Sequence, residues 1–381
     1  MRFMHLADLH LGKKVNEFFM LEDQKYVLEQ VVHIIGEEDV DGLLIAGDIY
    51  DKPVPSIEAV KLCDEFLTKV SQMNVPVFLI GGNHDSIERV SFGARLMSGS
   101  GIHMATVYDG EIDVVSVEDK YGTLDIYLLP FIKPAQVRAV WGEEAEEIKT
   151  YQDALSFVMD KTVIDESHRN ILLAHQFVTG GVVCDSEEHA VGGLDQVDVS
   201  CFDSFDYVAL GHLHGAQYAG RERVRYAGTL LKYSFSEVHH QKSVTVVELQ
   251  EKGYVDIYTK PIRPLHEMRE IRGNYAEVTS RGNYENTDTK DYVHITLTDE
   301  EDVFDAVGKL RAIYPNLMKL DYDNTRTRTT QVITSSGEEE NKDPLTLAEE
   351  LFTLQNNKPM SDVQKAYMQE LIRNVWEGEQ I

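Results

Sequence analysis

Five short motifs in this chain place side chains that bind metal ions directly after an apolar run. They are Asp8-Leu9-His10, Gly47-Asp48-Ile49-Tyr50-Asp51, Gly82-Asn83-His84-Asp85, Ala174-His175 and Gly211-His212-Leu213-His214. Carboxylate and amide oxygens bind hard divalent cations, and imidazole nitrogens suit manganese, iron and zinc. The motifs therefore predict a metal centre with the candidate ligands Asp8, His10, Asp48, Asn83, His175, His212 and His214.

Seven ligands are too many for one ion, so the pattern favours two ions that share Asp48. In two-metal sites the ions lie roughly 3.5–4 Å apart, activate a water and orient a phosphate. His84 is adjacent to a candidate ligand, and we expect it to be the general acid that protonates the leaving oxygen. Asp51 follows Asp48 closely, and we expect it to hold the His84 imidazole and favour its protonated form.

Ordinary turn chemistry is the alternative explanation for each motif taken alone. Glycine, asparagine and aspartate are common in turns, but turn chemistry does not account for His84. His212 and His214 are separated by one residue, so on a strand both imidazoles would point to the same side. That arrangement is costly unless a metal or an acid binds them. Together, the motifs favour a metal centre over unrelated turns.

The apolar runs before the motifs predict the elements that position them. Buried strands are expected at residues 2–7, 41–46, 75–80, 170–174 and 207–210, with amphipathic helices at residues 27–37 and 57–73. The order β-α-β-α-β implies a largely parallel sheet, and such sheets bind ligands at the carboxyl ends of their strands. Further strands are expected at residues 112–117, 124–129, 223–226 and 243–249. The predicted fold class is α/β, with two sheets packed face to face as a β-sandwich and helices outside.

The pattern of apolar and polar residues changes near Pro264. This change predicts that the first domain covers residues 1–265 and that further domains follow it. Residues 266–326 have a β-α-β pattern typical of a small separate domain, and residues 327–342 are polar and acidic, as in a linker. Residues 343–381 predict two amphipathic helices joined by a turn. These helices either fold back on the first domain or form a tethered module that binds a partner, and the acidic linker favours the module.

Composition and charge limit the functional classes. The chain of 381 residues has a net charge of −29, which argues against a broad basic surface for nucleic acid. Either nucleic acid is not the partner, or contact depends on metal ions, a local basic strip and a second subunit. The three cysteines lack the spacing of a metal site and indicate a reducing compartment. We expect no signal peptide, no membrane span and a cytoplasmic location.

Some basic side chains are candidates for contacts with a phosphate backbone. Lys13 and Lys14 follow the first motif directly. Arg221, Arg223 and Arg225 alternate along a predicted strand and would share one face. That face is either a phosphate-binding strip or an exposed edge of the sheet, and the sequence leaves both explanations open.

The five motifs resemble those of the calcineurin-like metallophosphoesterases. Within that family, the run Tyr226-Ala227-Gly228-Thr229-Leu230-Leu231-Lys232-Tyr233-Ser234-Phe235-Ser236-Glu237 is similar to the SbcD-type nuclease subunits of bacterial DNA-processing complexes. The resemblance covers residues 1–265 by motif, and the remainder only by the order and character of its elements.

The resemblance implies two manganese ions, with magnesium or another divalent cation as the alternative. One manganese would lie on Asp8, His10, Asp48 and His214, and the other on Asp48, Asn83, His175 and His212. It also implies that His84 assists phosphodiester cleavage. Asp51 matches the bacterial branch and the phosphatases, whereas archaeal and eukaryotic relatives tend to have histidine there.

The activity implied by the resemblance is 3′ to 5′ exonuclease action on duplex DNA and endonuclease action on single strands and hairpins. Such an enzyme would serve DNA recombination, replication and repair near the nucleoid. The resemblance also implies a homodimer, a capping role for residues 266–326 in DNA access, and an ABC/SMC-type ATPase bound through the C-terminal helices. The sequence contains no Walker-type glycine loop, so ATP binding would belong to that partner.

Two rival functions remain open. A phosphatase or cyclic-nucleotide phosphodiesterase would use the same metal centre, but the additional domain and the terminal helices disfavour it. A non-catalytic scaffold would be expected to have lost ligands, whereas all seven candidates are present.

Overall fold

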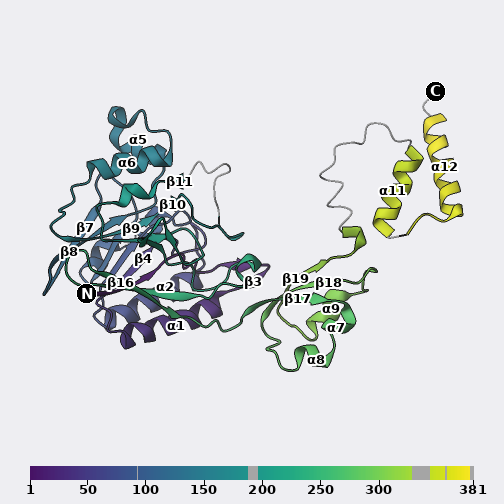
Figure 1. Ribbon diagram of the computed structural model, residues 1–381, viewed down its shortest axis with the longest axis horizontal. Helices are drawn as coiled ribbons and strands as arrows, with labels where there is room; N and C mark the ends of the chain where they lie inside the picture. The colour runs from purple at the N-terminus through teal and green to yellow at the C-terminus, as the bar shows by residue number, and fades with distance from the viewer. Residues whose placement is uncertain (92, 188–195, 328–343, 357, 378–381) are drawn as a thin grey trace. The chain divides into compact units, whose positions relative to one another are not determined.

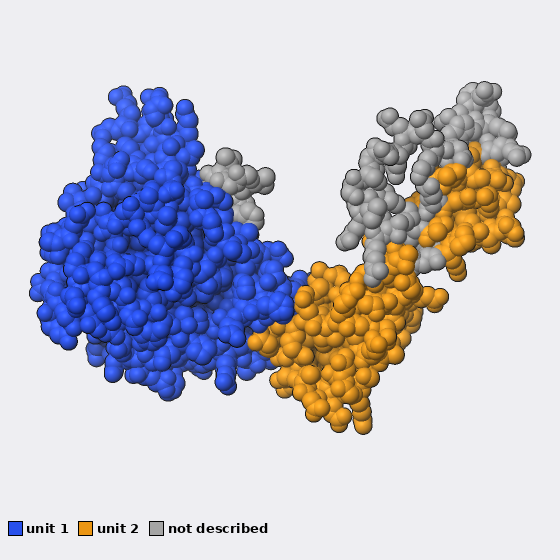
Figure 2. Space-filling model, viewed as in Figure 1, with its two compact units in different colours: residues 1–266 blue, residues 267–381 orange. Residues whose placement is uncertain are grey.

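The protein consists of two compact units. The computed structural model describes residues 1–91, 93–187, 196–327, 344–356 and 358–377 (Figure 1). The larger unit is Met1–His266 and the smaller is Glu267–Ile381 (Figure 2). Each unit is described separately below.

The first sheet of the larger unit carries the first three motifs. Its strand order is β16-β15-β1-β4-β5-β6, in which β1, β4, β5 and β6 are parallel and β15 and β16 are antiparallel additions. Helices α1 and α2 connect the parallel strands, as the sequence predicted. The bounds are β1 Arg2–Leu6, α1 Leu21–Glu37, β4 Gly42–Ala46, α2 Ile57–Gln72, β5 Val77–Ile80, α3 Ile87–Val90, α4 Ala94–Ser98, β6 Ile102–Ala105, β15 Ser243–Leu249 and β16 Val255–Pro261.

The second sheet carries the last two motifs. Its order is β13-β14-β12-β9-β8-β7, with β8, β9, β12 and β14 parallel and the two edge strands antiparallel. The bounds are β7 Asp113–Asp119, β8 Gly122–Leu129, α5 Pro134–Trp141, η1 Gly142–Ala145, α6 Tyr151–Lys161, β9 Arg169–His175, η2 Val199–Phe202, β12 Tyr207–Gly211, β13 Gln217–Ala219, β14 Arg221–Tyr226 and η3 Phe235–Glu237. Two small ribbons complete the unit, β2 Lys14–Val15 with β3 Phe18–Phe19, and β10 Phe177–Val178 with β11 Gln196–Val197.

The two sheets pack face to face around one apolar cluster. It contains Phe3 and Leu44 from the first sheet together with Leu173 and Ala209 from the second, all of them buried. A second cluster joins the outer face of the second sheet to α5 and α6. Figure 1 shows α1 and α2 on one side of the sheets and α5 and α6 on the other. The predicted two-sheet α/β sandwich is therefore confirmed.

The smaller unit contains a three-stranded parallel sheet of order β17-β18-β19. Its core includes Val293, Ile295, Leu310 and Tyr314. The sequence predicted β18-α9-β19 but not β17, in which Met268 and Ile271 are the only large apolar residues and are separated by two charged ones. The bounds are β17 Met268–Gly273, α7 Tyr275–Val278, α8 Arg281–Tyr284, β18 Tyr292–Leu297, α9 Ala306–Arg311 and β19 Leu317–Tyr322.

Two helices follow in the C-terminal part of the chain, α11 (Pro344–Asn356) and α12 (Asp362–Glu377). They contact each other, and Lys365 forms an ion pair with Glu349 across the contact. The expected acidic linker, residues 327–342, lies almost wholly outside the described residues. In the described part of the chain, no helix combines the length and apolar character that a membrane span requires.

Candidate metal centre

The candidate ligands lie at the carboxyl ends of strands from both sheets. Asp8 follows β1, Asp48 follows β4 and Asn83 follows β5, all in the first sheet. His175 ends β9, and it is in register with Gly211, the last residue of β12 in the second sheet. Because the two sheets meet at this edge, motifs from distant parts of the sequence come together.

The main chain at these ligands has an unusual conformation. The φ angles of Asp8, His10, Asp48 and His212 are 52°, 43°, 51° and 107°. Residues with a side chain rarely adopt positive φ, and such angles cluster at functional sites. Main-chain bonds stabilise the conformation, since His10 N donates to Asp48 O at 2.9 Å and Asp8 N donates to Gly47 O at 3.0 Å.

Glycines allow the close approach of the two sheets at the site. A Cβ on Gly211 would lie 1.8 Å from the carbonyl oxygen of Ala46 in the opposite sheet. A Cβ on Gly82 would lie 2.2 Å from Asp48 Oδ1. Neither position can carry a side chain without movement of the neighbouring main chain or ligand.

One group of ligand atoms comes from Asp8, His10 and His214, all buried and within 4.8 Å of one another. The Nε2 atoms of His10 and His214 are 3.1 Å apart, and His10 Nε2 is 3.7 Å from Asp48 Oδ2. Burial lowers the pKa of both imidazoles well below the ordinary value. Both are therefore neutral near pH 7, which is the form that binds a metal ion.

A second group lies beside the first and centres on Asp48. His175 Nε2 is 2.9 Å from Asn83 Oδ1 and 3.4 Å from Asp48 Oδ2. His212 Nδ1 is 3.1 Å from the same Asn83 oxygen. His175 Nδ1 donates to the Ala46 carbonyl oxygen at 2.8 Å, which directs Nε2 toward the carboxylates.

The buried carboxyl groups of Asp8 and Asp48 form a site whose negative charge favours bound cations. Burial raises the pKa of Asp8 well above its ordinary value, and the negative charge of Asp48 adds to this effect. Burial would also raise the pKa of Asp48, but His175, His10 and His84 together hold it below its usual range. Burial lowers the pKa of His175, but Asp48 outweighs this and raises it to about 9. A bound cation would replace the proton on His175 and compensate the buried carboxylates. The donor set therefore fits two divalent cations that share Asp48.

His84 lies at the mouth of this cluster. Its side chain is 17% exposed, whereas that of His175 is fully buried. Its main-chain N donates to Asp48 Oδ1 at 2.9 Å, and its Nε2 is 4.0 Å from Asp48 Oδ2. Its partial exposure leaves this imidazole within reach of a substrate.

The expected side-chain pair of Asp51 and His84 is not formed. His84 Nδ1 lies 3.1 Å from the main-chain carbonyl oxygen of Asp51. The Asp51 carboxylate instead accepts from Lys13 Nζ at 2.7 Å. The expected role of the Asp51 side chain is therefore corrected. The bridge between Leu11 and Tyr50 brings the two segments together and pairs Asp51 with Lys13.

Of the two explanations that the sequence left open for the arginines of β14, one shared phosphate-binding face is not what the structure shows. Arg225 is buried and donates to Thr245 Oγ1 in the first sheet at 3.2 Å. Arg223 donates to the carbonyl oxygen of Gly253, and Arg221 pairs with Asp203. The three arginines therefore do not form one exposed basic surface, because the second half of β14 is covered.

Lys14 remains a candidate for a phosphate contact. It is exposed on the β2–β3 ribbon, and its Nζ lies 5.1 Å from the ring centre of the exposed Phe19.

Several residues that hold the motifs together were not apparent from the sequence. Asp85 accepts from the main-chain N of Ile49, Tyr50 and Gly82, and so ties the second motif to the third. Gln24 Nε2 donates to the His10 carbonyl oxygen at 2.8 Å. Asp85 could have been found, because it stands in a motif, but no local pattern marks Gln24.

Comparisons with known proteins show the family to which the chain belongs. Residues 1–216 match the family model described as calcineurin-like phosphoesterase, and residues 264–356 match the one described as type 5 capsule protein repressor C-terminal domain. The chain is 30% identical over 386 residues to the SbcD subunit of nuclease SbcCD from Staphylococcus epidermidis, covering 100% of both chains. It is 33% identical over 324 residues to the protein of the same name from Staphylococcus saprophyticus, covering 84% of each.

Solved structures with a detectable likeness have low sequence identity. A dimetal phosphatase from Danio rerio is 12% identical with a TM-score of 0.40, covering 70% of this chain and 98% of that one. The protein TT1561 of Thermus thermophilus is 13% identical with a TM-score of 0.39, covering 69% and 99%.

Proposed function

Because this chain belongs to the calcineurin-like phosphoesterase family, we propose that it is the nuclease subunit of an SbcCD-type complex, a metal-dependent DNA phosphodiesterase. The observation that carries the proposal is the cluster of ligand atoms in which Asp8, His10 and His214 lie together and Asp8, Asp48 and His175 lie together, with the partly exposed His84 beside His10 and Asp48. The likeness to relatives named as the SbcD subunit of nuclease SbcCD supports DNA as the substrate.

The residues have distinct roles in this proposal. Asp8, His10, Asp48 and His214 hold one cation, and Asp48, Asn83, His175 and His212 hold the other. Two such cations supply positive charge that lowers the pKa of a water and neutralises the phosphate. The mixed set of carboxylate, amide and imidazole donors can hold manganese, and magnesium or another divalent cation is the alternative.

His84 supplies the proton in this proposal. A carbonyl oxygen only accepts, so the contact with Asp51 O keeps a proton on His84 Nδ1. In its imidazolium form His84 carries a second proton on Nε2, and that proton is the one transferred to the leaving oxygen, which returns the ring to the neutral Nδ1–H tautomer. The main chain of Asp51 orients the ring, and the ion pair of Asp51 with Lys13 stabilises that segment.

The specific activities are 3′ to 5′ exonuclease action on duplex DNA and endonuclease action on single strands and hairpins. The setting is DNA end processing in recombination, replication and repair, in the cytoplasm at the nucleoid. Residues 266–326 form the domain that caps the site and shapes DNA access, and residues 327–342 form the linker.

An SbcC-like ATPase of the ABC/SMC type binds through α11 and α12 in this proposal. The apolar side chains of Leu351, Val363, Tyr367 and Leu371 are exposed, with exposed fractions between 40% and 80%. Apolar positions of this kind on a helix fit a hydrophobic groove or a coiled coil of a partner.

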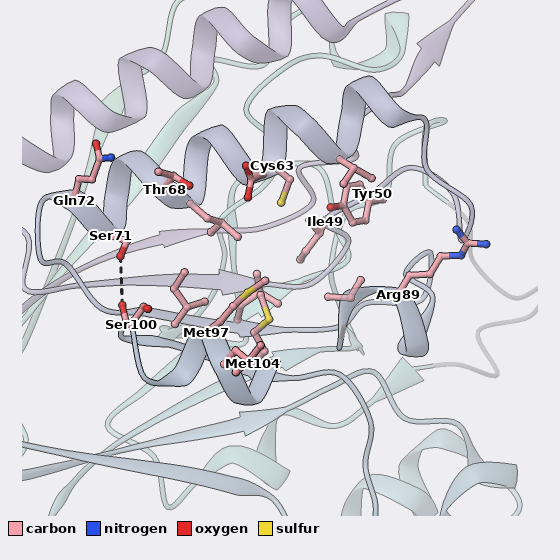
Figure 3. Close-up of a pocket in the computed structure, with 17 residues that line it drawn as sticks. Ile49, Tyr50, Cys63, Thr68, Ser71, Gln72, Arg89, Met97, Ser100 and Met104 are labelled. Atoms are coloured by element: carbon pink, nitrogen blue, oxygen red, sulfur yellow. Dashed lines mark hydrogen bonds between the residues drawn. The ribbon is translucent and has the colours of Figure 1, made fainter. Parts of the chain in front are cut away.

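The homodimer would use the helical side of the larger unit. A cavity of about 610 Å³ lies between α2 and the segment of α4 and β6. Figure 3 shows Cys63 of α2 facing Met97 and Met104 across it. Val60 and Leu96 at this cavity are 45% and 85% exposed, so a second copy would cover apolar surface here.

The test is cleavage of a hairpin oligonucleotide with manganese, by the chain alone and with an SbcC-like ATPase and ATP. Cutting that rises with the partner and ATP is expected. Turnover of a small phosphomonoester without any DNA cleavage would contradict the proposal and favour a phosphatase. Metal binding without turnover of either substrate would favour a non-catalytic scaffold.

A further inference from the structure

Behind His214 lies a buried chain of polar groups that the proposed function does not use. Ser186 Oγ is 2.6 Å from His214 Nδ1 and 2.6 Å from Glu237 Oε1. Glu237 Oε2 in turn accepts from Lys242 Nζ at 2.6 Å. Glu237 is fully buried and Lys242 is 8% exposed. An ion pair removed from water in this way is costly to bury and is tolerated only with complete hydrogen bonding.

The hydrogen bonding of the ion pair is complete. Lys242 Nζ also donates to Thr229 Oγ1 at 2.7 Å and to the carbonyl oxygen of His214 at 2.9 Å, which uses all three of its hydrogens. Glu237 Oε1 also accepts from the main-chain N of Tyr233 at 3.2 Å. Glu237 is therefore an acceptor at each of these contacts.

The direction of the bond at Ser186 follows from this. A serine hydroxyl has one hydrogen. Ser186 donates it in the hydrogen bond to Glu237, because that carboxylate offers only acceptor positions here. The lone pair of Ser186 Oγ then faces His214 Nδ1, which must carry the proton. His214 Nε2 is left with its lone pair, and Nε2 is the atom 3.1 Å from His10 Nε2 in the ligand group.

We propose that Ser186, Glu237 and Lys242 form a positioning relay that holds His214 in the Nδ1–H tautomer and thereby sets the affinity of the cation held by Asp8, His10 and His214. The inference rests on the proposed function, since it concerns the same metal centre. Glu187 supports the relay, because one of its carboxylate oxygens accepts from His214 N and the other from Cys184 N. The run of residues 226–237 thus acquires a physical role through Thr229, Tyr233 and Glu237.

Removal of the Ser186 hydroxyl, which connects His214 to Glu237, is the direct test. The full chain would be freed of metal and titrated with Mn²⁺ by calorimetry, together with Ser186→Ala, Ser186→Thr and Ser234→Ala. Ser186→Ala should weaken one of the two manganese sites by about 10- to 100-fold, the usual effect of losing a group that orients a ligand. Ser186→Thr keeps the hydroxyl and should restore the affinity.

Ser234→Ala is the matched control. Ser234 Oγ also contacts Glu237 Oε1, at 3.3 Å, and the described structure gives it no contact with His214. Its loss should leave both manganese affinities at the parental value. An equal loss in Ser234→Ala and Ser186→Ala would overturn the relay, because it would mean that any disturbance of Glu237 has the same effect.

A second measurement reads the tautomer without metal. Long-range ¹H–¹⁵N spectra of the metal-free chain with ¹⁵N-labelled histidine should show His214 protonated at Nδ1, with the signal assigned by its absence in His214→Gln. Glu237→Gln combined with Lys242→Met avoids an unpaired buried ammonium and should give a mixture of tautomers. An Nε2–H tautomer in the parent, or parental manganese affinity in Ser186→Ala, contradicts the proposal.

The outcomes separate this inference from the proposed function. A parent with the Nδ1–H tautomer and two manganese sites that cleaves no DNA would refute the nuclease assignment and leave the relay intact. Manganese-dependent DNA cleavage that is unchanged in Ser186→Ala, at parental manganese affinity, would refute the relay alone.

Discussion

His84 and Asp51 meet through the main chain, since His84 Nδ1 lies 3.1 Å from the carbonyl oxygen of Asp51. The carboxylate of Asp51 is directed to Lys13, 2.7 Å away. The orientation of the His84 imidazole therefore depends on the path of the backbone after β4. It does not depend on a charged pair between the two side chains.

His84→Ala should keep both metal sites and lose cleavage. The variant removes the proton donor but no candidate ligand of either cation, so cleavage of hairpin DNA should fall by about 10² to 10⁴, the usual contribution of general acid–base catalysis. Cleavage rates and manganese stoichiometry are measured on the same preparation. Cleavage within a few fold of the parent would show that His84 is not the acid.

Asp51→Asn should have a much smaller effect. The carbonyl oxygen that contacts His84 is retained. The ion pair with Lys13 is lost, and so is the longer approach of Asp51 Oδ1 to His10 Nδ1 at 3.9 Å. Because the contact that orients the His84 imidazole is kept, cleavage should fall by less than about tenfold. A loss of cleavage as large as that of His84→Ala would contradict this prediction. It would indicate that the Asp51 carboxylate acts on the His84 imidazole, as the sequence suggested.

Gly211→Ala should destabilise the larger unit strongly. The new Cβ would lie 1.8 Å from the Ala46 carbonyl oxygen, so the sheets must separate. Overpacking of this severity should reduce the free energy of unfolding by about 3 kcal/mol or more. Gly282→Ala in α8 of the smaller unit is the control for an added methyl group, because no atom beyond its chain neighbours and its own helix backbone lies within 4 Å of the new Cβ. Urea unfolding measures both, and equal stabilities would contradict the close approach.

Acid should destabilise the protein through His5. This fully buried imidazole contacts Tyr207 OH at 2.8 Å, and burial, with a smaller effect of Arg225, lowers its pKa from 6.5 to about 3. The unfolded chain binds a proton below pH 6.5 that the folded chain does not bind until about pH 3, so stability falls as the pH drops between these values. Between pH 7 and pH 5 the loss due to His5 should be about 2 kcal/mol.

Chelator-treated protein in urea at both pH values measures this loss. His5→Gln should lose about 2 kcal/mol less than the parent over the same interval. The exposed His33 provides the control, and His33→Gln should follow the parent. A His5→Gln variant with the parental pH dependence would show that His5 is not the group responsible.

The sequence predicted the strands and the residues that follow them because each motif stands directly after an apolar run. It could not predict which atom of Asp51 meets His84, since that depends on the positive φ at Asp48. Alternation along residues 221–226 predicted a shared face, but Arg225 is covered because the other sheet packs there. Ser186 and Glu237 are 51 residues apart, and only the tertiary fold brings them together.

The ligands of each proposed cation come from two different layers of the sandwich. His10 follows a strand of the first sheet and His214 one of the second, and the same division separates Asn83 from His175. A bound cation is therefore a cross-link between the layers, in addition to the close main-chain approach at Gly211 and the hydrogen bonds from His175 Nδ1 to Ala46 O and from His212 N to Asp8. The rigidity of this edge and the occupancy of the metal centre are thermodynamically coupled, so whatever loosens one sheet against the other also releases metal.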